Sequence, residues 1–200
     1  MIEIRKATEN DLQTIHDMAQ VVFRHTYRGI LSPEQMEYMM DMMYSMPNLQ
    51  KQLDEGHHFY IAYEAAIPCG YVSVQYEGPD PDGIEVFHLH KIYVMPDAQG
   101  RGVGLKLFRT VVDHVRAALL ESAPVCVSPT TVCSSPATCI VPPHRPARIE
   151  LNVNKFNAAV NFYRHLGMRV LLEEDFPIGN GFYKTDYIMG LDVLNEEIEK

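Results

Sequence analysis

A glycine-rich turn between a strand and a helix constrains the fold of this chain more than any other feature. Residues 97–104 read Asp-Ala-Gln-Gly-Arg-Gly-Val-Gly, after a strand-like segment, Phe87–Met95, that ends at Pro96. Apolar residues at helical spacing then run from Leu105 to Val115. Successive N–H groups and the helix dipole would point at one spot, so the turn predicts an anion site. A tight turn without a ligand is the alternative.

The anion site does not have the pattern of the common nucleotide loops. No Gly-Lys-Ser/Thr follows the turn, as a Walker loop would require, and the full Gly-x-Gly-x-x-Gly of a dinucleotide site is missing. Hydrophobic periodicity predicts the other elements in the order β-α-α-β-β-β-α-β-α-β-β. Strands are expected at 2–5, 58–64, 70–76, 87–95, 149–153, 168–176 and 183–191, and helices at 8–22, 32–43, 105–115 and 157–166.

Length and charge limit the classes of protein that this chain can be. Two hundred residues suit one domain, expected at 1–193, with an insertion at about 121–147 and a tail at 194–200. A formal net charge of -9 argues against nucleic acid and anionic lipid as partners. We find neither an apolar run of about 20 residues nor the layout of a signal peptide, so a cytoplasmic protein without a membrane anchor is expected.

The insertion is rich in proline, serine and cysteine. Six prolines between Ala123 and Pro146 exclude a continuous helix or central strand, which predicts a long, mobile segment. Cys126, Cys133 and Cys139 are separated by six and five residues, which is wider than the close pairs of structural zinc sites. We therefore expect no metal and predict that these thiols are reduced and non-catalytic.

Two separate motifs resemble those of the GCN5-related N-acetyltransferase (GNAT) superfamily. Ile92-Tyr93-Val94 with Pro96 and Gln99-x-x-Gly102-x-Gly104 resembles its acetyl-CoA motif, and Leu151-x-Val153 with Asn157, Tyr163 and Gly167-Met168 resembles its second half. The resemblance covers nearly all of the chain outside residues 120–147. It implies an α/β (α+β) fold with a mixed, mostly antiparallel, twisted sheet of about seven strands and about four helices. Residues 23–34 are similar to a bacterial branch that includes spermidine/spermine N-acetyltransferases.

The resemblance implies acetyl-CoA as co-substrate and a set of residues that bind it. Backbone groups of Ile92 and Val94 would pair with the pantetheine arm as if it were an added strand. Backbone N–H groups from Gly100 through Leu105 would hold the pyrophosphate, with charge from Arg101 and Lys106. Asn157 would contact the cofactor, but it lies one residue closer to Tyr163 than in many members, so Asn154 is a rival. The expected cofactor-binding residues are Ile92, Tyr93, Val94, Gln99, Gly100, Arg101, Gly102, Val103, Gly104, Leu105 and Asn157.

Acetyl transfer to an amine needs an acid for the departing thiolate and a base for the amine. The resemblance makes Tyr163 the acid, with a core aromatic as the alternative role, and makes the Val94 N–H the group that polarises the thioester carbonyl. Some members have a glutamate at the position of His88, so His88 is the candidate base. Strand alternation predicts one shared face for His88, His90, Ile92 and Val94. Glu85 and Glu150 are the reserve bases.

The acceptor stays open at this stage. The chain's acidity would suit a polyamine, and a small amine or a peptide N-terminus is also compatible. A non-catalytic acyl-CoA-binding or regulatory module is the first alternative to an enzyme, and a nucleotide-binding protein of another fold is the second. The closing strands around residues 179–181 could pair with a second copy through an exposed edge, which suggests a homodimer.

Overall fold

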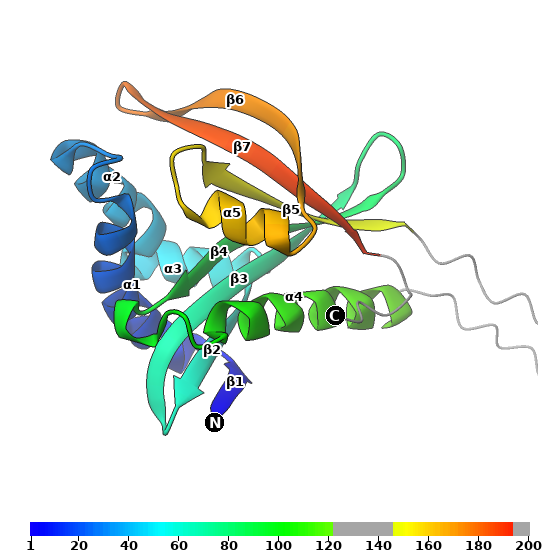
Figure 1. Ribbon diagram of the computed structural model, residues 1–200, viewed down its shortest axis with the longest axis horizontal. Helices are drawn as coiled ribbons and strands as arrows, with labels where there is room; N and C mark the ends of the chain where they lie inside the picture. Colours follow the sequence, from blue (N-terminus) through cyan, green and yellow to red (C-terminus); the bar gives the residue numbers. More distant parts are fainter. Residues whose placement is uncertain (122–145, 194–200) are drawn as a thin grey trace, which may run out of the picture.

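The computed structural model describes residues 1–121 and 146–193. A seven-stranded sheet forms the centre, with helices against both of its faces (Figure 1). The strands are β1 (Ile2–Lys6), β2 (His58–Glu64), β3 (Ile67–Pro79), β4 (Glu85–Val94), β5 (Ala147–Asn154), β6 (Arg169–Gly179) and β7 (Phe182–Val193). The helices are α1 (Leu12–Tyr27), α2 (Pro33–Tyr44), α3 (Met46–Asp54), α4 (Val103–Glu121) and α5 (Ala159–His165), with short 3₁₀ turns at Glu9–Asp11 and Pro96–Ala98.

The sheet opens between its two central strands. The strand order is β1-β2-β3-β4-β5-β7-β6, and every neighbouring pair is antiparallel except β4 and β5. The parallel pairing of β4 with β5 covers only Glu85–His88 against Ala147–Glu150. Both strands continue for several residues beyond this pairing. Beyond His88, the edge of β4 that faces β5 therefore has no neighbouring strand, although the other edge stays paired with β3. A ligand can enter the sheet at this open edge.

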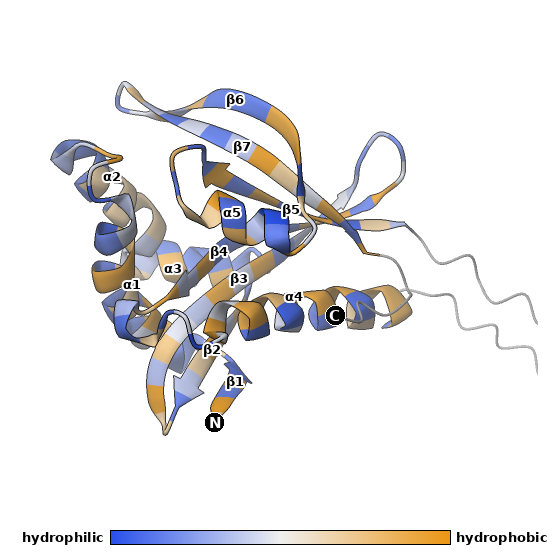
Figure 2. Ribbon diagram, in the orientation of Figure 1, coloured by the Kyte–Doolittle hydropathy of each residue, from blue (hydrophilic) through white to orange (hydrophobic). Residues whose placement is uncertain are grey.

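Each face of the sheet has its own hydrophobic core. One core packs α4 and α5 on residues such as Val72, Val74 and Leu89, and the other packs α1, α2 and α3 on Phe59, Ile61 and Tyr71. Hydrophobic and hydrophilic residues alternate along α4 (Figure 2), whose buried residues face the sheet. The two cores explain why the central strands are apolar on both faces, as covered strands are.

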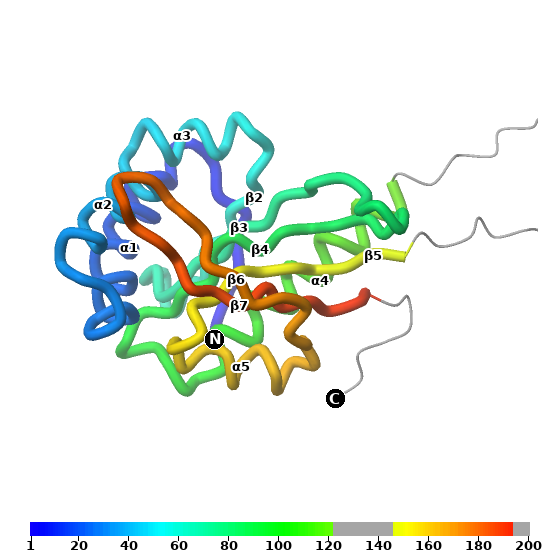
Figure 3. Tube along the Cα trace, turned by 90° about the horizontal axis from the view of Figure 1, so that it is seen from above, coloured from blue at the N-terminus to red at the C-terminus, as the bar shows by residue number. Residues whose placement is uncertain are grey.

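The helix starts follow local sequence signals. Thr8 and Asp11 form a capping box, in which the Thr8 N–H donates to the Asp11 carboxylate at 2.8 Å. The Ser32 hydroxyl accepts from the Gln35 N–H at 3.1 Å, and Pro33 occupies the first helical position of α2. The Gln35 side chain does not complete a capping box; it donates to the Tyr183 carbonyl of β7 at 2.8 Å. This bond ties α2 to the β6–β7 hairpin, whose tip lies over α2 in Figures 1 and 3.

The predicted fold class is confirmed, including the seven strands, and one helix was not predicted. That helix, α3, has nine residues, starts with Pro47 in its first turn and buries only Leu49. A single buried side chain gives too weak a periodic signal to separate a helix from a loop.

One prediction about β4 was wrong because the strand contains a β-bulge. Ser73 pairs with Lys91 and Val74 pairs with Leu89, so His90 is an extra residue without a cross-strand partner in β3. The bulge reverses the alternation, so that Ile92 and Val94 pack on the α4 side while Tyr93 packs on the α1 side. His88 and His90 therefore do not share a face with Ile92 and Val94.

Two of the predicted segments lie outside the described residues. The proline-rich insertion with its three cysteines falls within residues 122–145, and the proposed tail within 194–200, so neither is described. Within 1–121 and 146–193, no helix is long and apolar enough to cross a membrane. In the same residues, no group of His, Cys, Asp and Glu side chains is placed to hold a metal ion.

Candidate active site

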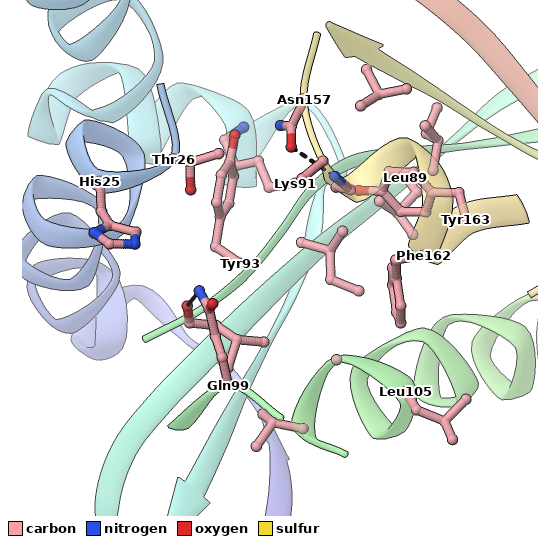
Figure 4. Close-up of a pocket in the computed structure, with 18 of the residues that line it drawn as sticks. His25, Thr26, Leu89, Lys91, Tyr93, Gln99, Leu105, Asn157, Phe162 and Tyr163 are labelled. Carbon is pink, nitrogen blue, oxygen red and sulfur yellow. Dashed lines mark hydrogen bonds between the residues drawn. The ribbon is translucent and has the colours of Figure 1, made fainter. Parts of the chain in front are cut away.

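A cavity of about 620 Å³ opens where β4 separates from β5. Figure 4 shows its lining residues, which come from α1, β4, the glycine-rich turn, the start of α4, β5 and α5. All but one of the predicted cofactor-binding residues line this first cavity, together with Tyr163. They are Ile92, Tyr93, Val94, Gln99, Gly100, Gly102, Val103, Gly104, Leu105 and Asn157.

The backbone of β4 presents to the first cavity polar groups that are not paired with a neighbouring strand. The Met95 N–H donates to the Cys69 carbonyl at 2.9 Å, so Met95 faces β3. Because N–H and C=O directions alternate along a strand, Val94 and Ile92 then face the opposite edge, where β5 has already separated. The Gln99 side chain donates to the Val94 carbonyl at 3.1 Å, consistent with this direction. An extended ligand could pair with this edge as an additional strand would.

The glycine-rich turn ends at the free N-terminus of α4. Gly100 and Gly102 have φ angles of 72° and 78°, in the left-handed region that glycine adopts without steric cost. The Lys106 N–H bonds to the Gly102 carbonyl at 3.1 Å, so the N–H groups of residues 103–105 precede the first helical bond. These donors and the positive end of the helix dipole point toward one spot, at the turn where the sequence predicts an anion site.

Two basic side chains that were expected at this anion site lie elsewhere. The Arg101 guanidinium donates to Glu64 of β2 at 2.9 Å, and the Lys106 ammonium donates to the Ile2 carbonyl at 3.3 Å. Neither residue lines the first cavity. Recognition of an anion at this turn would thus depend on backbone N–H groups, with Arg101 contributing at most its own N–H.

The α5 residue Tyr163 is buried and faces the first cavity (Figure 4). Burial raises the pKa of its phenol well above the usual value near 10, with a further contribution from Tyr27. The phenol is therefore protonated at neutral pH and can donate a proton or a hydrogen bond. Tyr27 and Tyr93 also line this cavity, and burial raises the pKa of each.

The structure separates the two asparagines that competed for the cofactor contact. Asn157 lines the first cavity, and its side-chain oxygen accepts from the Ala159 N–H at 2.9 Å at the start of α5 (Figure 4). Asn154 lines a different cavity, and its side-chain oxygen accepts from the Phe156 N–H at 3.1 Å. Asn157 is thus the better placed of the two for a ligand in the first cavity.

A second cavity of about 450 Å³ lies on the α1–α3 side and meets the first. Five residues line both cavities: Tyr27, His90, Lys91, Tyr93 and Asn152. Methionines of α2 and the β7 residues Lys184 and Asp186 complete the second cavity. Tyr38 of α2 donates to the Ile178 carbonyl of β6 at 2.8 Å, which holds the covering helix against the hairpin. Ligands in the two cavities would therefore contact some of the same β4 residues.

Three histidines cluster in the second cavity. The ring centroids of His57 and His90 are 4.2 Å apart, and those of His88 and His90 are 4.5 Å apart. Burial is the main cause that lowers the pKa of His57 and of His88 to about 4 and that of His90 to about 2, and neighbouring cations add to it. All three imidazoles are therefore neutral at pH 7 and can accept a proton.

The reserve bases lie away from both cavities. Glu85 accepts a hydrogen bond from the Tyr76 hydroxyl and lines a separate cavity near His58 and His114. Glu150 pairs with His88 across the parallel strands, and its carboxylate lies 3.4 Å from the Arg148 guanidinium. Of the three candidate bases named from the sequence, His88, Glu85 and Glu150, His88 is the one that lines the second cavity.

Lys91 is the site residue that sequence reasoning missed. It is 6% exposed, lines both cavities, and donates to the Gln52 side chain of α3. Burial, with a contribution from Lys184, lowers its pKa to about 7. The available signal was a lysine in a strand rich in apolar residues, where a charged residue is costly to bury.

Comparison with known proteins identifies the class that this fold and site define. A family model described as acetyltransferase (GNAT) domain matches residues 55–169, more than half of the chain. The chain therefore belongs to the GNAT acetyltransferase family. It is an acetyltransferase with acetyl-CoA as co-substrate, and the resemblance seen in the sequence is confirmed at the level of the superfamily.

Solved structures share the fold at low sequence identity. The PaiA N-acetyltransferase of Thermoplasma acidophilum in complex with coenzyme A has a TM-score of 0.67 at 19% identity, over 95% of this chain and 98% of that one. The ribosomal-protein-S18-alanine N-acetyltransferase of Escherichia coli has a TM-score of 0.63 at 16% identity, over 100% and 99%. Arabidopsis thaliana Naa50, in complex with the bisubstrate analogue CoA-Ac-MVNAL, has a TM-score of 0.56 at 14% identity, over 95% and 97%.

Proposed function

We propose that this protein is an N-acetyltransferase that transfers the acetyl group of acetyl-CoA to a primary amine by direct attack in a ternary complex. The main support is that two cavities meet at a shared wall of β4. A thioester lying along the first cavity and an amine lying in the second could come together there without a covalent enzyme intermediate. Polyamines, small amines and peptide N-termini are the acceptor classes that the proposal includes.

The first cavity fits acetyl-CoA through its backbone. The edge of β4 at Ile92 and Val94 would pair with the pantetheine arm, and the N–H groups of residues 100–105 would hold the pyrophosphate. The side chain of Asn157 would contact the arm near the start of α5. When bound, acetyl-CoA supplies an acetyl group activated as a thioester.

The residues around the shared wall can supply the proton transfers. The Val94 N–H would polarise the thioester carbonyl, because it faces the gap between β4 and β5. His88, neutral at pH 7, would accept a proton from the amine as the new C–N bond forms. Tyr163 would donate its proton to the departing sulfur as the C–S bond breaks. The two residues thus serve opposite ends of the transfer, and protons exchanged with solvent restore both.

Free-thiol release from acetyl-CoA tests this proposal directly. Wild type and Tyr163→Phe would be compared with a panel of polyamines, small amines, amino acids and peptides, while calorimetry measures coenzyme A binding. Amine-dependent thiol release that falls sharply in the variant supports the proposal. Coenzyme A binding without thiol release for any amine would instead favour a non-catalytic acyl-CoA-binding module.

The proposal also includes a homodimer formed through β6. This strand is at the edge of the sheet, and Val170, Leu171 and Leu172 are 40%, 37% and 47% exposed. An apolar edge strand of this kind supports pairing with a second copy. Light scattering at several concentrations, with Leu172→Lys as the disrupting variant, would test the dimer.

A further inference from the structure

The second cavity contains a buried cation without a counter-ion. Lys91 donates to Gln52, and its ammonium lies 5.7 Å from the ring centroids of Tyr44 and Phe59. In the described ranges, 1–121 and 146–193, Lys91 forms no ion pair with a carboxylate. A buried ammonium without an opposite charge is unfavourable, because its transfer out of water is not compensated by an ion pair. An anion that enters the cavity would supply the missing partner.

The other charged groups leave the cavity with an excess of positive charge. Lys184 is 3.2 Å from Asp186, so these two β7 residues pair with each other. The three histidines are neutral at pH 7, as described above, and Glu77 lies outside the cavity lining. The titratable groups around Lys91 are Lys184 and Asp186 on β7, His88, His90 and Tyr93 on β4, His57 before β2, Tyr27 on α1 and the Tyr44 phenol on α2.

This charge pattern differs from that of the whole chain. The protein carries a formal net charge of -9, yet the lining of the second cavity has two lysines and one aspartate among its charged residues. A polycation would meet uncompensated lysine charge on binding there. The pattern favours an acceptor of opposite sign.

We infer that the acceptor is a small primary amine that also carries an anionic group, a carboxylate or a phosphate, and that Lys91 binds this group at the wall shared by the two cavities. The inference rests on the proposed function and names the substrate class of the same site. A cavity of about 450 Å³ is of a size that suits a small molecule. Lys91 then acts in acceptor specificity rather than in proton transfer.

Matched acceptor pairs test the inference by kinetics. Each amino acid would be compared with its amide, and 2-aminoethyl phosphate with ethanolamine, so that the two pairs distinguish a carboxylate from a phosphate. We expect kcat/KM for the anionic member to exceed that of its partner by roughly 30-fold, the effect of one buried ion pair. Lys91→Met should remove this preference, whereas Lys51→Met, at an exposed position on α3, should keep it.

A binding measurement gives a second readout that does not depend on activity. Binding of an anion raises the pKa of Lys91 from its value of about 7, so protons are taken up when the anion binds near pH 7.5. Calorimetry in two buffers of different ionisation enthalpy measures this uptake. The ligands would be an N-acetyl amino acid and its amide, neither of which has a titratable amine. Uptake is expected for the acid with wild type, and not for the amide or for Lys91→Met.

The outcomes separate failure of this inference from failure of the proposed function. Equal or faster turnover of neutral amines or polyamines would overturn the inference and leave the acetyltransferase activity standing. Binding of the N-acetyl acid without proton uptake, or with equal uptake by Lys91→Met, would also overturn it. Absence of thiol release with every amine would contradict the proposed function, and the calorimetric comparison would still test Lys91.

Discussion

The Nδ1 atom of His88 lies 3.7 Å from the Glu77 carboxylate, across the pair formed by β3 and β4. The imidazole is mostly buried, whereas Glu77 is nearly half exposed, so the carboxylate connects a buried group with solvent. A proton accepted by His88 would be stabilised by this neighbour, which is the arrangement expected of a base with an orienting acid.

Replacing His88 with alanine should lower kcat strongly. Loss of a general base typically costs about 10²-fold or more, and the KM for acetyl-CoA should change little because His88 lines only the second cavity. Steady-state kinetics with the best acceptor measures both constants. His58→Ala is the matched control, since His58 faces a separate cavity. An unchanged kcat and pH profile in His88→Ala would show that another group is the base.

Removing the hydroxyl of Tyr163 should slow thiol release without preventing cofactor binding. We expect Tyr163→Phe to lower kcat by about 10²-fold, because the ring stays in place while the proton donor is lost. Thiol release and coenzyme A affinity are measured on the same sample. Tyr183→Phe, at a residue 61% exposed on β7, serves as control and should behave as wild type. If Tyr163→Phe released thiol as fast as Tyr183→Phe, Tyr163 would have a packing role and not a role as proton donor.

Two glycines allow backbone strain to be separated from cofactor binding. Gly102 and Gly29 have φ angles of 78° and 81°, and a Cβ at either would meet no atom within 4 Å. Alanine should therefore destabilise both sites similarly, by roughly 1–2 kcal/mol. Gly102→Ala alone should weaken coenzyme A binding, because it alters the turn before α4. Denaturant unfolding and calorimetry measure the two effects, and equal affinity in both variants would argue against the anion site.

The protein should lose stability as the pH falls below neutrality. Burial lowers the pKa of His57, His88 and His114 to about 4 and that of His90 to about 2, while the unfolded chain titrates near 6.5. The unfolded state then binds more protons, so the contribution to stability is complete above pH 6.5 and is lost as the pH falls through 4. Urea unfolding at pH 7.5 and 5.5 should differ by roughly 2–5 kcal/mol.

A histidine variant provides the control for this pH dependence. His88→Gln should reduce the difference between the two pH values, whereas His165→Gln, at an exposed position, should leave it unchanged. A stability that is the same at pH 5.5 and 7.5 would mean that the buried histidines are charged or solvated in the folded protein.

In the ligand-free protein, Lys91 should lower the free energy of unfolding. Its pKa falls from 10.5 to about 7 on folding, so stability is lost as the pH falls from above 10.5 to about 7. Replacing a buried charge with an apolar side chain of similar length often stabilises by roughly 1–4 kcal/mol. We therefore expect Lys91→Met to unfold at a higher urea concentration at pH 7, with Lys51→Met unchanged. A destabilised Lys91→Met would indicate that Gln52 and the aromatic rings compensate the ammonium.

The sequence predicted those features that depend on local pattern. The glycine-rich turn, the helix that starts near residue 32 and the order of the strands follow from turn chemistry and hydrophobic periodicity, and the family motifs pointed to Tyr163 and Asn157. The long-range features were not accessible in this way. A bulge at His90 is a property of the β3–β4 pairing, and the ion pair that removes Arg101 from the cavity depends on Glu64 in a distant strand. Lys91 was missed because its burial depends on α3, which has only one buried residue.

The extra residue in β4 determines which side chains of the strand reach each face of the sheet. Before His90, even-numbered residues face the α1–α3 side; after it, odd-numbered residues do. If β4 kept its length but lost the bulge, strict alternation would exchange Lys91 and Tyr93 with Ile92 and Val94 and place a lysine in an apolar core. Among relatives, we expect one that lacks only this extra residue to keep the residues equivalent to Lys91 and Tyr93 on the α1–α3 side and to differ in the length of β4.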